Sequence, residues 1–94
     1  MMRVGTLEVV LRIAGAASLK DKRQVVRSLV ATARNKFNIS VAEVDDLDNW
    51  KQATIGIACV SKDIQHVNEV LDKVHNHLCS CPEAEVIDSA LDLD

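Results

Sequence analysis

The chain has 94 residues and a formal net charge of -3, with 48% hydrophobic and 27% charged residues. This length suits one domain whose core needs no metal or disulfide, and these proportions are those of globular domains, which excludes disordered and fibrous classes. Three cysteines argue against a secreted disulfide framework, and we find neither a signal peptide nor a membrane-spanning stretch. We therefore expect a single cytoplasmic domain over residues 1–94, without membrane partners.

The first half of the chain predicts a strand and a helix. Residues 4–13 alternate apolar and polar side chains, the pattern of a half-buried strand. After a break of small residues, Ser18 and Asp21 have the spacing of a capping box. A helix is therefore expected from Ser18 to about Lys36, with its apolar residues on one side.

The second half predicts three more strands and one helix. Residues 39–44 and 53–61 are expected to form strands separated by an acidic loop. Ser61 is positioned to cap a following helix, which Pro82 should end. Residues 85–93 alternate again, so we expect this strand to bury one face, that of Ile87, Ser89, Leu91 and Leu93.

This order of elements predicts an α+β, ferredoxin-like βαββαβ domain, in which a four-stranded antiparallel sheet carries two helices on one face. The helices should leave the other sheet face to small and polar side chains, those of Thr6, Glu8, Arg12, Gly56, Ala58, Asp88 and Asp92. Open sheets of this class have edge strands that can pair across a two-fold axis. A reversible homodimer is therefore expected.

Several ordered blocks of the chain resemble the bacterial YlxP-like family of unknown function. They are SLKDKR at 18–23, RNKFNISVAEVDD at 34–46, Trp50, ATIG at 53–56, and Val60 with Ser61. The resemblance implies a ferredoxin-like fold and, in many genomes, a gene beside those for transcription-elongation, translation-initiation and ribosome-binding factors. It implies no activity and no site, and the segment from His75 to Cys81 lies outside the family pattern.

Charge is distributed unevenly along the chain. Residues 1–37 contain eight lysines and arginines and two acids, whereas residues 38–94 contain three and twelve. On a helical wheel Lys20, Arg23, Arg27 and Arg34 lie on one flank of the first helix. Guanidinium groups in a row suit the phosphates of a structured RNA or an acidic protein surface. The alternatives are a solvated face and pairing with the acids of the loop at 45–48.

The loop between the second and third strands carries Asp45, Asp46 and Asp48, with Glu43 before them and Trp50 after them. Their spacing fails the EF-hand template, so we expect the acids to orient the loop or pair with cations and not to hold a metal ion. Trp50 packs near the sheet edge or, in the sharper hypothesis, anchors a partner.

Two pairs of possible metal ligands lie near the end of the second helix. His75 and Cys79, like His77 and Cys81, are four residues apart, but the two pairs diverge by roughly 200° on the helix. We therefore predict no zinc and no other cofactor. We expect Cys59 to fill space in the core as a small apolar residue.

No nucleophile is spaced with a base and an orienting group, and the chain has no glycine-rich phosphate loop, so we predict no catalytic residues. The expected function is that of a small binding module that acts as an accessory factor for ribosomal or other structured RNA. Its predicted contacts are Lys20, Arg23, Arg27, Arg34 and Trp50. A module that binds an acidic protein or dimerises is the first alternative, and a small enzyme or metal-binding protein is the second. The central strands lack the aromatic residues of an RNA-recognition motif, so any RNA contact should be made to the backbone.

Overall fold

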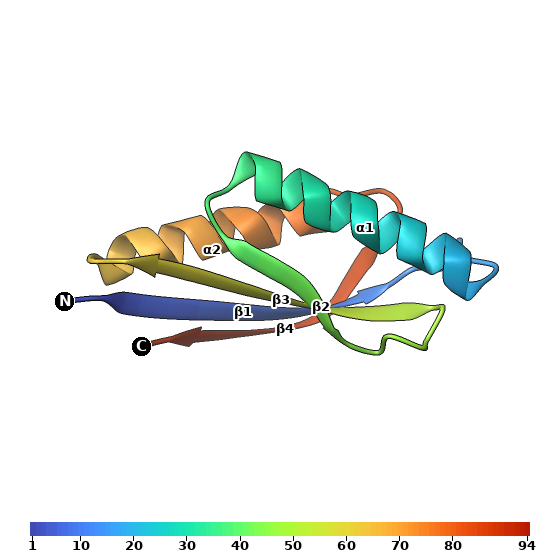
Figure 1. Cartoon of the computed structure of the whole chain (residues 1–94), viewed down its shortest axis with the longest axis horizontal. Coiled ribbons are helices and arrows are strands. Elements are labelled where there is room, and N and C mark those ends of the chain that lie inside the picture. Colours follow the sequence, from blue (N-terminus) through green and yellow to red (C-terminus); the bar gives the residue numbers. More distant parts are fainter.

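A computed structural model describes all 94 residues and contains the six elements in the predicted order (Figure 1). The strands are β1 (Arg3–Arg12), β2 (Ser40–Asp45), β3 (Gln52–Ser61) and β4 (Glu85–Leu93). The helices are α1 (Leu19–Lys36) and α2 (Ile64–Cys79). Each strand boundary lies within one residue of its predicted position.

The sheet has the strand order β2-β3-β1-β4, and each neighbouring pair is antiparallel. Strand β1 is central, since Leu7 lies opposite Ile57 of β3 on one side and Leu91 of β4 on the other. Strands β2 and β4 form the edges. The ferredoxin-like α+β prediction is therefore confirmed.

Both helices cover the same face of the sheet (Figure 1). The alternate side chains Leu7, Val9 and Leu11 of β1 are buried beneath them, together with Val67 and Leu71 of α2. Strand alternation therefore leaves the predicted small and polar set on the open face. The predicted residues are confirmed there, but the exposed Val44 and Val60 share this face, so it is not purely small and polar.

The helix ends follow the predicted chemistry with one correction. The amide of Asp21 donates to Ser18 Oγ at 3.1 Å, and Asp21 Oδ2 accepts from the amide of Ala17 at 3.0 Å, so the capping prediction for α1 is confirmed. Helix α2 is capped by Asp63, which accepts from the Gln65 amide at 2.9 Å, and not by Ser61.

Strand β4 departs from the prediction that it buries one face. Leu91 and Leu93 lie opposite Leu7 and Gly5, on the helix side of the sheet, yet they are 51% and 38% exposed. Helix α2 packs mainly over β1 and β3, so it covers the edge strand only in part. A bulge also brings Val86, in place of the predicted Ile87, opposite Leu11. Neither helix combines the length and apolar composition required to cross a membrane.

Candidate functional site

The structure brings four of the five predicted contact residues together. Lys20, Arg23, Arg27 and Arg34 have exposed side chains on one flank of α1, and we call this group the basic stripe. Arg34 Nη2 donates to the carbonyl oxygen of Val41 in β2 at 3.0 Å, which places this flank beside the free edge of β2. The basic stripe makes no ion pair with any acid of the chain. Its charges are therefore available to an external anion.

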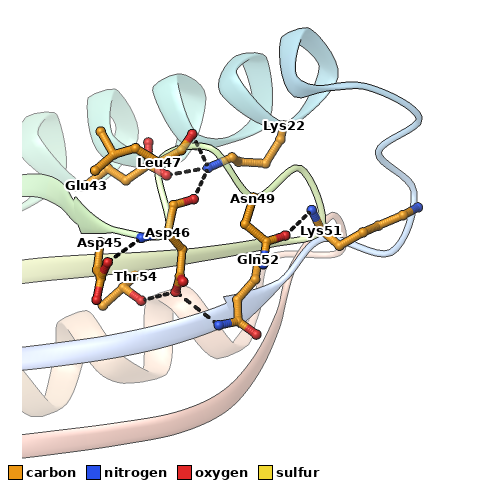
Figure 2. A network of polar contacts seen from close by, with 9 residues as sticks. All are labelled: Lys22, Glu43, Asp45, Asp46, Leu47, Asn49, Lys51, Gln52 and Thr54. Atoms are coloured by element: carbon orange, nitrogen blue, oxygen red, sulfur yellow. Dashed lines mark hydrogen bonds and ion pairs between the residues drawn. The ribbon is translucent and has the colours of Figure 1, made fainter.

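A fifth cation of the same helix has the opposite environment. Lys22 is fully buried, and its Nζ lies 2.5 Å from Glu43 Oε2, the protein's one ion pair (Figure 2). The same ammonium donates to the carbonyl oxygens of Asp46 at 3.0 Å and Leu47 at 3.4 Å. Three acceptors thus satisfy the three ammonium protons, as a buried charge requires.

Asp46 organises the turn that follows β2. Its φ of 62° lies in the left-handed region, which aspartate tolerates better than most residues. Its Oδ2 accepts from Thr54 Oγ1 at 2.7 Å and Gln52 Nε2 at 3.0 Å, and its amide donates to Asp45 Oδ1 at 2.8 Å (Figure 2). Hydrogen bonds from Gln52 and Thr54, with a smaller contribution from the Lys22 charge, hold the pKa of Asp46 below its usual value.

Trp50, the fifth predicted contact residue, lies in this loop and is 44% exposed. Its ring faces the ammonium of Lys51 at 5.2 Å, and Lys51 also donates to the carbonyl oxygens of Ala14 at 3.1 Å and Ala16 at 2.5 Å. No hydrogen bond or cation–π contact joins Trp50 to the basic stripe. Lys51 therefore fixes the loop between β2 and β3 against the loop before α1, with Trp50 at the surface.

The acids of this loop do not converge on a common point. Glu43 faces Lys22, Asp46 faces Gln52 and Thr54, and Asp45 accepts from a neighbouring amide. No group of three or more histidine, cysteine, aspartate or glutamate side chains in the protein has the spacing of a metal site. The acids orient the loop, as the sequence suggested.

His75 and His77 lie on opposite flanks of α2. His75 lines a groove with Leu91 of β4, and its Nδ1 lies 3.8 Å from Cys79 Sγ. His77 packs edge-on against Phe37, with ring centroids 5.7 Å apart. The divergence predicted from helical geometry is confirmed. Cys59 is buried in the core, and burial raises the pKa of its thiol.

Sequence reasoning missed the role of Lys22 and its partners. Two signals could have found it. Lys22 falls in the middle of the apolar arc of α1, near Val26 and Leu29, and Glu43 follows the buried Val41 at the alternate position of β2. A cation and an acid on two buried faces should be paired with each other.

Comparison with known proteins gives a family but no activity. Residues 4–91 match a family model described as "Protein of unknown function (DUF503)". Over 82 residues the chain is 35% identical to "Uncharacterized protein YlxP" of Bacillus subtilis (strain 168), an alignment that covers 87% of this chain and 89% of that protein. The resemblance predicted from the blocks at 18–61 is therefore confirmed, and the chain belongs to the DUF503 family, to which it is matched over almost its whole length.

Proposed function

We propose that this protein is a cytoplasmic binding module that contacts the phosphate backbone of ribosomal or other structured RNA through the basic stripe on α1. The observation that carries the proposal is the contrast within one helix. Lys22 is buried and neutralised by Glu43, whereas Lys20, Arg23 and Arg27 are exposed and make no ion pair or hydrogen bond within the protein. In a chain with a net charge of -3, these cations form a local positive surface.

The fold supports contact with the RNA backbone in preference to its bases. Side chains on the open face of β1 and β3 include no aromatic residue on which a base could stack. Exposed guanidinium groups along a helix bind phosphates in pairs of hydrogen bonds and distinguish little between sequences. The three free cysteines agree with a reducing compartment.

The test is the salt dependence of binding to purified ribosomal RNA. Changing Arg23→Ala and Arg27→Ala together should leave the fold intact and should lower the affinity. It should also reduce the slope of log affinity against log salt by roughly 1.4–1.8, since each lost phosphate contact removes about 0.7–0.9. The matched control changes Lys62→Ala and Lys73→Ala, two exposed cations outside the stripe, and should retain the wild-type slope.

Wild-type protein that shows no RNA binding at low salt, or equal losses in the two double variants, would overturn the proposal. An acidic protein would then be the better candidate for the stripe, and it would be recognised by selective capture that depends on Arg23 and Arg27.

We also propose that the module self-associates through an edge of its open sheet, independently of RNA.

A further inference from the structure

We propose that β4 is a homodimerisation edge, along which a second copy of the chain adds its own β4 antiparallel about a two-fold axis at Leu91. This inference deepens the proposed self-association and does not depend on RNA binding. It begins with the exposed leucines of β4. Leu91 and Leu93 lie on the helix side of the sheet with about half and a third of their surface in contact with water.

The backbone of β4 offers free hydrogen-bonding groups at the same residues. The amide of Asp94 donates to the carbonyl oxygen of Val4 at 2.9 Å. Opposed residues of an antiparallel ladder alternate between hydrogen-bonded and non-bonded pairs. The backbone N–H and C=O groups of Asp92 and Ala90 therefore point towards β1, like those of Asp94. Ser89, Leu91 and Leu93 therefore direct their N–H and C=O groups to the free edge. The amide of Ser89 accordingly finds a substitute acceptor, Asp88 Oδ1 at 2.9 Å.

The opposite edge of the sheet is less suited to strand addition. Strand β2 has six residues, whereas β4 has nine. A bulge interrupts β2 between Glu43 and Asp45, and Arg34 already occupies the outward carbonyl oxygen of Val41. Short, bulged edges covered by charge resist pairing. With one open edge per chain, association closes as a dimer and does not extend into a fibre.

Shape and charge favour an axis at Leu91. An axis at Ser89 would run the pairing into the bulge at Ile87. An axis at Leu91 places Ser89 opposite Leu93 of the second copy and Ala90 opposite its Asp92, so that a small side chain meets a larger one. Carboxylates are directly opposed only where Asp88 meets Asp94 at the strand ends, and like charges in that position repel.

A groove in the monomer has room for the incoming leucine. It has a volume of about 190 Å³ and lies between α2 and β4, with Leu7, Leu71 and Leu91 as its apolar lining and Ser89 on its strand side. Because Leu93 of the second copy pairs with Ser89 and points to the same face, its side chain enters this groove. By the same two-fold symmetry, Leu93 of the first copy enters the equivalent groove of the second copy.

Both basic stripes remain exposed in such a dimer. Helix α1 contacts β2, which is the edge farthest from β4. A continuous eight-stranded sheet therefore places the two stripes at opposite ends. Self-association should be unaffected or strengthened by added salt, since salt screens the repulsion between Asp88 and Asp94, whereas RNA binding should weaken.

The test measures the mass of wild-type protein by light scattering and sedimentation up to millimolar concentration. Wild type should reach the mass of a dimer. Leu91→Lys should weaken self-association by at least about tenfold, which corresponds to about 1.4 kcal/mol. The matched control is Val60→Lys, the same change at an apolar strand residue that is 60% exposed and lies on the open face of β3, and it should dimerise like wild type.

A measurement on the wild type alone keeps the proposal testable if a variant folds poorly. Raising the protein concentration should slow hydrogen exchange of the outward amides of Leu91 and Leu93, while Ala90 and Asp92 should be protected at every concentration. Monomeric wild type at all concentrations would overturn the dimer. A dimer whose formation leaves these two amides unprotected would overturn the β4 edge as its interface. Neither result bears on RNA binding.

Discussion

Lys22 and Glu43 join α1 to β2 through an ion pair with 2.5 Å between Nζ and Oε2, in a protein whose other helix cations face solvent. The side chain of Glu43 is 14% exposed and that of Lys22 is not exposed at all. A buried pair of this kind adds little stability over an apolar pair, but removal of one partner leaves a charge without compensation.

Replacing Lys22→Met should destabilise the protein by about 3 kcal/mol, because Glu43 and two carbonyl oxygens lose their donor. For a domain of this size each 1 kcal/mol shifts the melting temperature by about 4–8 °C, so a fall of more than about 10 °C is expected. Thermal unfolding followed by circular dichroism measures it. Lys20→Met, an exposed neighbour, is the control and should change the melting temperature little. The double change Lys22→Met, Glu43→Leu should recover part of the loss, and a single variant no less stable than the control would refute the role of the pair.

The low pKa of Asp46 predicts a contribution to stability that depends on pH. The folded protein binds the Asp46 proton more weakly than the unfolded chain, whose reference pKa is 3.8. The stabilisation is therefore complete above that value and is lost as pH falls through the lower, folded pKa. Asp46→Asn keeps the backbone tolerance for positive φ but removes the charge. Urea unfolding should show a gap between wild type and variant that is wide at about pH 7 and narrows towards about pH 3. A gap of constant width would mean that the charge of Asp46 does not matter.

Substitution by alanine should have opposite effects on the stability of the protein at Gly5 and Gly15. A Cβ at Gly5 would clash with Val67 Cγ1 and lie 2.9 Å from Leu71 Cδ1, so these side chains of α2 would have to move. Overpacking of this kind costs about 1–3 kcal/mol. At Gly15 no atom lies within 4 Å of the new Cβ, and its φ is not positive. Gly15→Ala should be neutral or stabilise by up to about 1 kcal/mol. Denaturant midpoints compare the two variants, and equal midpoints would contradict the packing of α2 on Gly5.

Arg34 should differ from the rest of the basic stripe in its effect on stability. Arg34→Ala removes the hydrogen bond to Val41 and should cost about 1 kcal/mol. Arg27→Ala, which removes an exposed cation without a hydrogen-bond partner in the protein, should change stability by less than about 0.5 kcal/mol. Chemical denaturation distinguishes them. If both changes were silent, the Arg34 contact would be too mobile to protect the β2 edge.

Local patterns in the sequence were sufficient to predict most of the fold. The alternation in β1 and the apolar arcs of α1 and α2 depend on residues close together in the chain, and the basic stripe follows from the same helical periodicity. The capping of α1 by Ser18 is likewise local.

What the sequence did not predict depends on contacts between distant residues. The alternation in β4 is the same for a covered strand and an edge strand, and only the position of α2 over β1 and β3 leaves Leu91 exposed. The bulge at Ile87 changes the face of Val86 without a glycine or proline to mark it. The pairing of Lys22 with Glu43 joins residues 21 positions apart, so the local pattern can mark each charge as lying on a buried face but cannot identify its partner.

The central place of β1 also determines the order in which the chain can complete its structure. Its partner on one side is the last strand, and Arg3 donates to the carbonyl oxygen of Asp94, a residue 91 positions away. Closing a loop of that length costs entropy before any contact compensates for it, and nonlocal pairing of this kind slows folding. During synthesis β1 can therefore pair with β3 first, while its backbone groups on the β4 side stay unpaired until β4 has been made. A chain that stops before β4 would leave β1, with its buried Leu7, Val9 and Leu11, at a sheet edge, where aggregation can begin.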